Sequence, residues 1–399
     1  MPQSRLRLSS NIKQSRGGNM KKAIMVLITL SLVIGGLGSV ALTEGGQLIN
    51  MPRDWVFTLF QYKGLLTVAM LLLAVAALWL STRNKVFSKM VLSLYVVSIL
   101  GCTFLINWFA PDFWLRSQQH NANFMSVEEA DSRLQSNDDV FVLEINGDAR
   151  AYPRDWMQLP HIAGDVVGGQ DTVMTYCALS NLPMAFNPNM NGQPTDFKII
   201  AQVHNNLIFT DRNSGELIQQ VTATAEYSQT ELEQYPVQRM PWESFKALYP
   251  EGQVFNYEPV LYDHVTLKLF DSALEPHYEG EPMFPTLSLE DDRLATGEQV
   301  WGVQVGNESV AVTTEDFTEK NQLVVELSNQ KILFVNYEEY QTVAAYFVDD
   351  SRDWEITEVD PYGSYTSGKL ERVNLYSGMP WMVWSHWFPE TQLVNKQTI

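Results

Sequence analysis

Cysteine is nearly absent from this chain of 399 residues, which contains only Cys102 and Cys177. Cys102 lies inside an apolar run and is expected to be a packing residue there. Cys177 stands alone in the C-terminal two-thirds of the chain. This scarcity excludes an internal disulfide in that part and any Cys-x-x-Cys pair. A domain there must therefore be stabilised by its own hydrophobic core.

Acidic residues are also nearly absent from the first 110 residues, which hold only Glu44 and Asp54 against eleven Lys and Arg. Residues 111–399 carry the other 44 of the 46 acids and 16 of the 27 basic residues, a net charge of −28. Such a charge repels nucleic acid and anionic lipid headgroups, so neither is an expected partner of this acidic part. This negative charge attracts cations or a basic protein surface, and it also helps to keep a domain soluble.

Three runs of the N-terminal part have no charged residue at all, over 23–42, 64–80 and 90–109. Each is about as long as a helix needs to be to cross a hydrocarbon core of ~30 Å. In lipid, such segments can satisfy their backbone groups only as helices. The sequence therefore predicts a membrane region over 23–110 with about three transmembrane helices.

The basic residues predict how these helices are oriented. They crowd the segment 1–22 and the short loop 81–89, whereas the loop 43–54 has the single base Arg53. The positive-inside rule places 1–22 and 81–89 in the cytoplasm. We expect a multi-pass protein of the inner (plasma) membrane, with its C-terminal domain in the periplasm or outside. A start at Met20 and a cleaved signal peptide would leave two spans and the same location for this domain.

The C-terminal part is predicted to be α+β and mainly β. Residues 111–135 read as a connector with a short helix capped by Ser126. Residues 140–147 read as a strand that ends in an Asn-Gly turn, and the strand resumes after it, which predicts a β-hairpin. Further strands are expected over 171–177 and 196–211.

An internal repeat runs through this domain. Residues 239–255 align without a gap with 378–394, and both segments share Met-Pro-Trp and a later Pro-Glu-x-Gln. Upstream, 140–152 resembles 300–312, and both segments read as hairpins. A duplicated unit explains both matches and is far longer than a solenoid repeat.

The repeat predicts an extracytoplasmic domain of two pseudo-symmetric β-rich halves, 136–260 and 261–399. In each half a Pro-Trp pair is expected to begin a short helix, because proline fits the first turn. The aromatic side chains that follow, led by Trp242 and Trp381, are expected to cap each half's core.

The segment 149–186 resembles a bacterial family known as domain of unknown function 3179. The family pattern has a Tyr-Pro, a loop histidine, an aspartate, a Gly-Gly turn and a strand ending in Tyr-Cys-Pro-Leu-Cys. This chain matches it at Tyr152, Pro153, His161, Asp165, Gly168, Gly169, Tyr176 and Cys177. Ser180 replaces the family's second cysteine, so a dithiol couple is not available here. The resemblance covers roughly 135–395 and implies an architecture but no established activity.

The reactive residue types permit two kinds of chemistry. His161, Cys177 and His204 offer imidazole and thiolate donors suited to copper or zinc, with Asp165 available to orient a histidine. Alternatively, Cys177 is a nucleophile, with His161 or His204 as base and Asp165 orienting the imidazole. An acidic surrounding works against the second hypothesis, because it disfavours a thiolate.

The interpretation that we favour is a membrane-anchored module of the cell envelope that binds a ligand or a partner protein; a metal- or thiol-dependent enzyme is the alternative. The expected ligand-contacting residues are aromatic or polar: Tyr152, Tyr176, His204, Asn206, Asp211 and Arg212. Asp211-Arg212 with Gly215 is also ordinary turn chemistry. His277 is expected at the surface, and His386 has Ala247 as its counterpart in the repeat.

Overall fold

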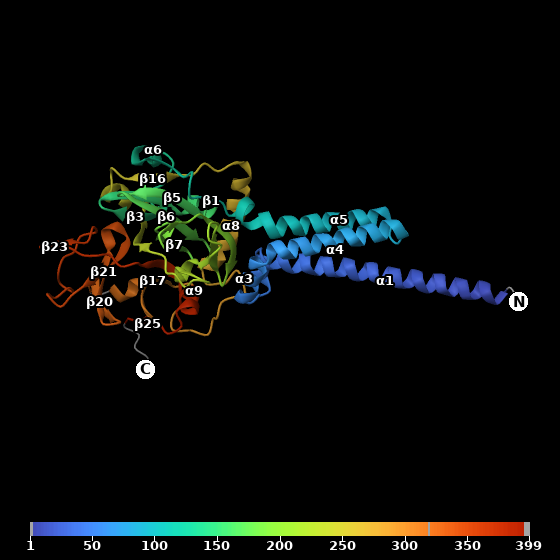
Figure 1. The fold of residues 1–399 in the computed structure, drawn as a ribbon. Helices are drawn as coiled ribbons and strands as arrows, with labels where there is room; N and C mark the ends of the chain where they lie inside the picture. Colours follow the sequence, from blue (N-terminus) through green and yellow to red (C-terminus); the bar gives the residue numbers. More distant parts are fainter. Residues whose placement is uncertain (1–2, 318–319, 395–399) are drawn as a thin grey trace. The chain divides into compact units, whose positions relative to one another are not determined.

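The computed structural model describes residues 3–317 and 320–394 (Figure 1). The chain divides into two compact units, Met1–Phe113 and Trp114–Ile399. The first two residues of the expected basic segment 1–22 and the last five of the expected half 261–399 lie outside the described residues.

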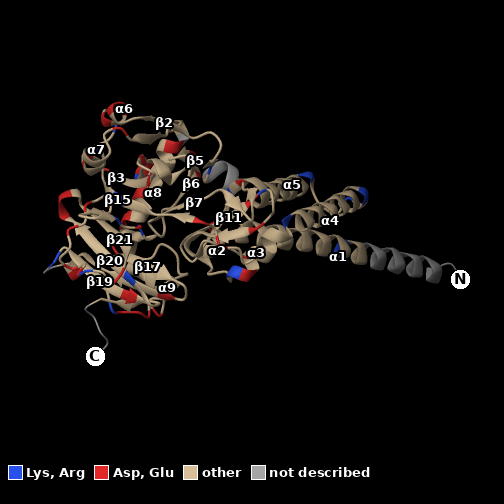
Figure 2. Cartoon of the chain, turned by 60° about the vertical axis from the view of Figure 1, so that its left-hand side comes forward, with Lys and Arg blue, Asp and Glu red and all other residues tan. Residues whose placement is uncertain are grey.

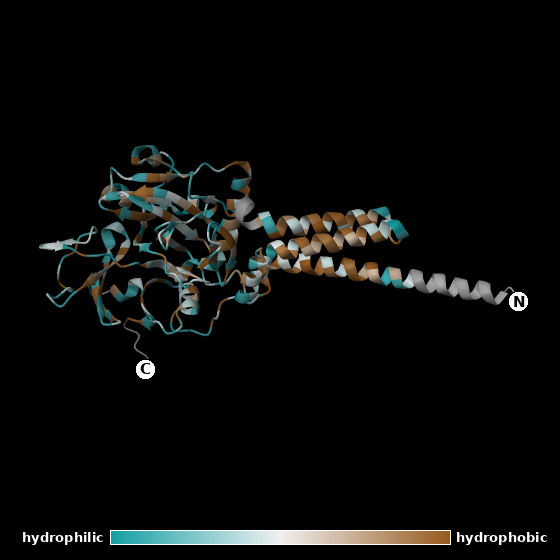
Figure 3. Cartoon of the chain, in the orientation of Figure 1, coloured by the Kyte–Doolittle hydropathy of each residue, from teal (hydrophilic) through white to brown (hydrophobic). Residues whose placement is uncertain are grey.

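The N-terminal unit is helical. Its elements are α1 (Gln3–Ala41), α2 (Gly45–Leu48), α3 (Arg53–Gln61), α4 (Lys63–Asn84), α5 (Lys89–Phe104) and the π-helical η1 (Leu105–Trp114). Three helical stretches are long and apolar enough to cross a membrane: Gly18–Ala41, Lys63–Asn84 and Lys89–Phe109. The predicted apolar helices are therefore confirmed in number and place, and Figure 3 shows their apolar character.

The three long helices pack through a narrow apolar seam. Met70 and Ala77 on α4 are fully buried, and Ile99 on α5 packs with them. The Ser31 and Tyr95 hydroxyls, which are 2.6 Å apart, form a buried hydrogen bond across the seam. Many Leu and Val side chains on the outer surface of these helices are exposed, which is the pattern of a helix surrounded by lipid.

The C-terminal unit is α+β and rich in strands. One five-stranded sheet has the order β15-β3-β4-β16-β2. Its strands are β2 (Asn123–Ser126), β3 (Asp139–Ile145), β4 (Asp148–Pro153), β15 (Val237–Pro241) and β16 (Gln253–Asn256). β3 and β4 form the predicted hairpin, with Asn146 and Gly147 both at positive φ. β16 lies parallel to β4, and β2 pairs antiparallel with the other edge of β16.

A second five-stranded sheet and a smaller one complete the first part of this unit. The former has the order β1-β5-β6-β7-β14 and the latter β10-β11-β12-β13. Their strands are β1 (Ser117–Gln118), β5 (Ile162–Val167), β6 (Gln170–Cys177), β7 (Leu182–Phe186), β14 (Gln234–Tyr235), β10 (Phe197–Val203), β11 (Asn206–Asp211), β12 (Leu217–Gln219) and β13 (Thr224–Ala225). A small hairpin joins β8 (Asn189–Met190) to β9 (Gln193–Pro194).

The second part contains a four-stranded sheet of order β24-β17-β18-β25 and the three-stranded meander β19-β20-β21. The strands are β17 (Gln299–Val305), β18 (Glu308–Val312), β24 (Tyr376–Pro380), β25 (Gln392–Leu393), β19 (Gln322–Leu327), β20 (Gln330–Tyr337) and β21 (Thr342–Val348). β22 (Ser364–Tyr365) and β23 (Gly368–Lys369) form a short hairpin. β25 is parallel to β18, as β16 is to β4.

Short helices connect these sheets. They are α6 (Val127–Asp131), α7 (Trp242–Leu248), α8 (Leu261–Tyr278) and α9 (Trp381–Trp387), with 3₁₀ turns η2 (Arg154–Gln158), η3 (Gln220–Thr222), η4 (Thr314–Phe317) and η5 (Glu338–Tyr340). The two Pro-Trp segments form helices, as predicted, with proline at the N-cap of each. Trp242 and Trp381 are fully buried. The backbone N–H of Trp242 donates to the Asp138 carbonyl, and the backbone N–H of Trp381 donates to the Glu298 carbonyl.

The expected connector 111–135 is largely part of the domain. β1 pairs with β5, β2 pairs with β16, and Leu115 is buried in the core. Ser126 caps α6 as predicted, in a capping box with Glu129. The long-range strand pairing draws this segment into the sheets, which its polar composition did not suggest.

A single large hydrophobic cluster runs from Phe141 and Tyr176 in the first part to Val300 and Trp384 in the second. This cluster joins the two parts, and each part has a further buried cluster of its own, around Trp242 in the first and Phe334 in the second. Acidic side chains are spread over the strands and loops of this unit, whereas basic side chains mark the α4–α5 turn (Figure 2).

Candidate functional site

Arg154 lies where β4 ends and η2 begins, directly after the Tyr152-Pro153 pair. Its guanidinium carbon is 5.1 Å from the centre of the Tyr278 ring, and its Nη1 is 3.9 Å from the Asp139 carboxylate. Its Nε is buried and has no hydrogen-bond partner among the described residues. Burial alone would lower the pKa of Arg154, but nearby tyrosine and aspartate side chains raise it above its ordinary value. Arg154 is therefore a cation with unused hydrogen-bonding capacity.

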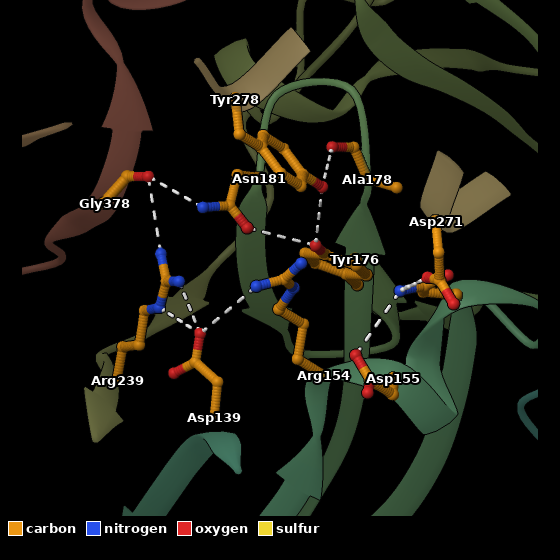
Figure 4. Close-up of polar contacts among 11 residues, drawn as sticks. Asp139, Arg154, Asp155, Tyr176, Ala178, Asn181, Arg239, Asp271, Tyr278 and Gly378 are labelled. Carbon is orange, nitrogen blue, oxygen red and sulfur yellow. Dashed lines mark hydrogen bonds and ion pairs between the residues drawn. The ribbon is translucent and has the colours of Figure 1, made fainter. Parts of the chain in front are cut away.

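Two tyrosines lie beside this cation (Figure 4). The Tyr176 hydroxyl donates to Asn181 Oδ1 at 3.1 Å and lies 3.4 Å from the Tyr278 hydroxyl. The Tyr278 hydroxyl donates to the Ala178 carbonyl at 2.6 Å. Burial raises the pKa of both phenols, so both stay protonated and serve as hydrogen-bonding groups.

The second part of the domain contributes a backbone carbonyl to the same network. Gly378 O accepts from Asn181 Nδ2 at 2.9 Å and from Arg239 Nη1 at 3.4 Å (Figure 4). Arg239 Nε donates to Asp139 at 2.6 Å. Gly378 has a φ of +72°, and a Cβ there would collide with the Arg239 guanidinium. Only glycine fits this position without strain.

A cavity of about 570 Å³ opens between η2 and α8. Arg154 and Lys268 give it two positive charges, and Asp271, Glu275 and Glu279 give it three negative ones. The volume is typical of a site for a small molecule. Groups of both signs in one cavity can bind a ligand that also carries both signs.

Gln158 lies in the wall of this cavity and is 1% exposed. Its Nε2 donates to Asp271 at 3.2 Å and lies 3.4 Å from Asp155. Its Oε1 is buried without a hydrogen-bond partner among the described residues. Such an acceptor is costly in a folded protein unless a ligand or solvent satisfies it.

The structure does not bring His161 and Cys177 together. The Tyr176 N–H donates to the His161 carbonyl at 2.9 Å, so these two residues are cross-strand partners and their side chains share one face. Cys177 follows Tyr176 along β6, and its side chain therefore points to the other face. Burial lowers the pKa of His161 to about 3 and raises that of Cys177 to about 11. At neutral pH both groups are uncharged.

Asp165 does not orient a histidine. Its Oδ2 accepts from Arg150 Nε at 2.5 Å, and Arg150 also pairs with Asp148. The carboxylate of Asp165 is thus held by Arg150 in this structure.

His204 takes part in a different contact. Its Nδ1 is 2.9 Å from the Thr286 carbonyl and 3.1 Å from His386 Nε2, and the two rings are stacked with their centres 4.8 Å apart. His386 Nδ1 accepts from the Ser288 N–H at 2.9 Å. Burial, and then the neighbouring His204, lower the pKa of His386 to about 4. His204 and His386 thus fasten the segment 286–288 to the β10–β11 turn.

Copper or zinc would need a group of donors that converge. Among residues 3–317 and 320–394, no group of three or more His, Cys, Asp or Glu is arranged to hold a metal ion. The donors suggested by the sequence, His161, Cys177 and His204, are therefore not assembled into a site.

The other expected ligand-contacting residues have structural partners. Tyr152 is fully buried and packs against the Phe124 and Phe255 rings. Asn206 is fully buried, and its amide binds Ser180, Gln219, Gln220 and the Val221 N–H. Asp211 accepts from the backbone N–H groups of 196, 213 and 214, which is the turn chemistry considered above. Arg212 is nearly half exposed, with Asp196 3.7 Å away. Tyr176 alone of these residues belongs to the network of Figure 4.

His277 was expected at the surface, and this prediction is wrong. It is fully buried; its Nε2 is 2.6 Å from the Leu179 carbonyl, and its Nδ1 accepts from the Met283 N–H. Sequence reasoning also missed Arg154, although it directly follows the Tyr-Pro pair, and Gln158. Tyr278 lies about a hundred residues from Tyr176, and no local pattern connects them.

One family model matches this chain, over residues 119–391, and its description is "Protein of unknown function (DUF3179)". No curated protein and no solved structure gives a match. The matched range includes η2, β6, α8 and Gly378, and so the whole network of Figure 4 and the cavity beside it. Since the match covers well over half of the sequence, the chain belongs to this family of proteins of unknown function.

Proposed function

We propose that this protein is a multi-pass protein of the inner (plasma) membrane whose C-terminal domain lies outside the cytoplasm and binds a small zwitterionic ligand. The ligand class is a compound with an anionic group and an amine, such as a free amino acid or a short peptide. The basic residues of 1–22 and 81–89 support the orientation, because Lys and Arg stay on the cytoplasmic side.

The observation that carries the binding proposal is Gln158 in the cavity wall. Its buried Oε1 is an acceptor that lacks a partner among the described residues, and an amine of the ligand would satisfy it. Arg154, whose Nε is also without a partner there, would bind the anionic group. The carboxylates of Asp271 and Glu275 would add attraction for the amine.

The experiment is a ligand panel against the full-length protein in detergent, read by thermal shift and then by calorimetry. The panel holds amino acids and dipeptides, amines without an anion, dicarboxylates without an amine, and neutral sugars. Only compounds with both charges should raise the unfolding temperature. Failure of every zwitterion, or equal stabilisation by neutral sugars, would contradict the proposal.

Two variants make the test specific to the cavity. Arg154→Met should weaken binding roughly 10- to 100-fold, because a charge-assisted hydrogen bond is lost. Arg212→Met is the matched control. Arg212 was expected from the sequence to contact a ligand, but it is a surface arginine outside the cavity lining. Equal affinities for the wild-type protein and Arg154→Met, at unchanged unfolding temperature, would place the ligand elsewhere.

We also infer that the domain consists of two copies of one unit, as the sequence repeat suggests. Support comes from strand positions: β3 to β7 recur as β17 to β21 at an offset of 160, and β15 and β16 recur as β24 and β25 at an offset of 139. Arg154, Tyr176 and Asn181 then correspond to Thr314, Asn336 and Gln341. On this inference Arg154, Tyr176 and Asn181 of the polar network belong to the first half, and the second half supplies Tyr278, Gly378 and part of the core.

A further inference from the structure

Within residues 3–317 and 320–394, no strand covers the outer edge of β25 (Gln392–Leu393), whereas the corresponding edge in the first part of the domain is covered. β16 pairs with β4 on one side and with β2 on the other. β25 pairs with β18, and no other strand among residues 3–317 and 320–394 pairs with it. An uncovered strand edge presents backbone groups that can bind another extended chain.

The segment that would cover this edge lies elsewhere. At the offset of 160, the β2 residues 123–126 correspond to 283–286. Thr286 instead contacts the β10–β11 turn: its carbonyl lies 2.9 Å from His204 Nδ1, and its hydroxyl accepts from Asn205 Nδ2 at 2.8 Å. The four-stranded sheet thus has an edge at β25 to which a fifth strand could pair, and the segment 283–286, which would be expected there, contacts the β10–β11 turn instead.

A cavity of about 950 Å³ borders this edge. Val324 and Val325 give it an apolar wall, and residues 392–394 form its strand side. The carboxylates in its lining are those of Glu290, Asp291, Asp292, Glu326 and Glu390. Among residues 3–317 and 320–394 the one base in the lining is Arg293, which is paired with Asp291. The surroundings of the edge are therefore strongly negative.

We propose that β25 receives an extended, lysine- or arginine-rich segment of a partner protein, which adds to the sheet as a strand. Backbone hydrogen bonds to β25 would hold the segment, alternate apolar side chains would meet Val325 on the face that carries Val310, and basic side chains would meet the carboxylates. A second copy of this chain is disfavoured as the occupant, because edge-to-edge pairing would bring two acidic clusters together. This inference does not depend on the zwitterion cavity.

The test uses the full-length protein in detergent and a labelled peptide of alternating Lys and Val, with fluorescence anisotropy as the readout. A control peptide has the same sequence but an N-methyl group on every central amide, which keeps the charge and removes the N–H donors on both edges of the peptide. We expect the methylated peptide to bind at least about tenfold more weakly, since two or more hydrogen bonds of about 1 kcal/mol are lost. Equal binding of the two peptides would overturn the proposal.

Charge variants locate the peptide. Glu326→Gln combined with Glu390→Gln should weaken binding severalfold, and Glu358→Gln, an exposed acid outside the cavity lining, should leave it unchanged. Arg154→Met should also leave peptide binding unchanged, which separates this surface from the zwitterion cavity. Unchanged affinity of the double variant, or dimerisation of the protein that displaces the peptide, would contradict the proposal.

Discussion

The Cys177 thiol is fully buried, and its Sγ lies 3.7 Å from the Asn205 carbonyl. Burial raises its pKa to about 11, although the Ser180 hydroxyl and neighbouring backbone N–H groups favour the thiolate. Because the thiolate is the reactive form, a protonated and enclosed thiol is a poor nucleophile. Its packing among core residues makes Cys177 a structural residue in this fold.

Native protein at pH 7.5 should therefore show almost no alkylation of Cys177 by iodoacetamide. Peptide mass spectrometry measures the labelled fraction, and the same protein in denaturant supplies the control in which Cys177 reacts fully. Rapid labelling of the folded protein would show that the thiol is accessible and ionised, and would revive the nucleophile hypothesis.

At the scale of residues, the sequence predicted the local role of a side chain better than the neighbours that it meets in the fold. Asp211 is a turn residue, as its Asp-Arg-Asn-Ser-Gly context indicates. The strand that ends at Cys177 was also predicted, but the face that each of its side chains occupies depends on pairing with His161 across the sheet. Arg154 and Tyr278 meet only because α8 returns to η2, a long-range contact that no local pattern encodes.

The helices that follow the two Met-Pro-Trp segments, α7 and α9, pack differently against their sheets. Phe245 on α7 packs in a cluster with Val142 of β3, whereas Trp384 on α9 lies against Gly302 of β17. A Cβ at Gly302 would collide with the Trp384 ring. The pair of Gly302 with the large Trp384 ring and the pair of Val142 with the smaller Phe245 ring therefore fill similar volumes.

Gly302→Val alone should destabilise the domain by roughly 1–3 kcal/mol through overpacking, and Trp384→Phe alone should do so by leaving a cavity. The double variant recreates the pair formed by Val142 of β3 and Phe245 of α7. Its loss of unfolding free energy should be smaller than the sum of the losses in the two single variants. Thermal unfolding midpoints measure this, at about 2–4 °C per kcal/mol. Strict additivity of the two losses would mean that these positions are not coupled.

At the scale of elements, local signals were sufficient for hairpins and short helices. The Asn-Gly turn of β3–β4 and the Pro-Trp starts of α7 and α9 are confirmed. The parallel pairing of β16 with β4 and the addition of β1 and β2 to the sheets were not predictable. These contacts join residues more than a hundred positions apart or lie in polar segments, so neither periodicity nor turn chemistry reports them.

For the whole molecule, the uneven charge distribution has the clearest physical consequence. The apolar helices of the N-terminal unit have basic residues at the α4–α5 turn, and the acids are concentrated in the C-terminal unit (Figure 2). Moving Lys or Arg across lipid is costly, so the proposed orientation follows from where these residues lie. The cavity beside α8 would then open to the compartment outside the cytoplasm.

Labelling of Ser272→Cys by a membrane-impermeant maleimide in intact cells tests whether the C-terminal domain and its cavity lie outside the cytoplasm. Ser272 is exposed on α8 and lines the cavity, and its hydroxyl makes only a local hydrogen bond to Leu269 O. We expect labelling without permeabilisation, slowed when a stabilising zwitterion is present. Labelling only after the cells are lysed would contradict the orientation, and a rate that no zwitterion changes would contradict ligand binding at this cavity.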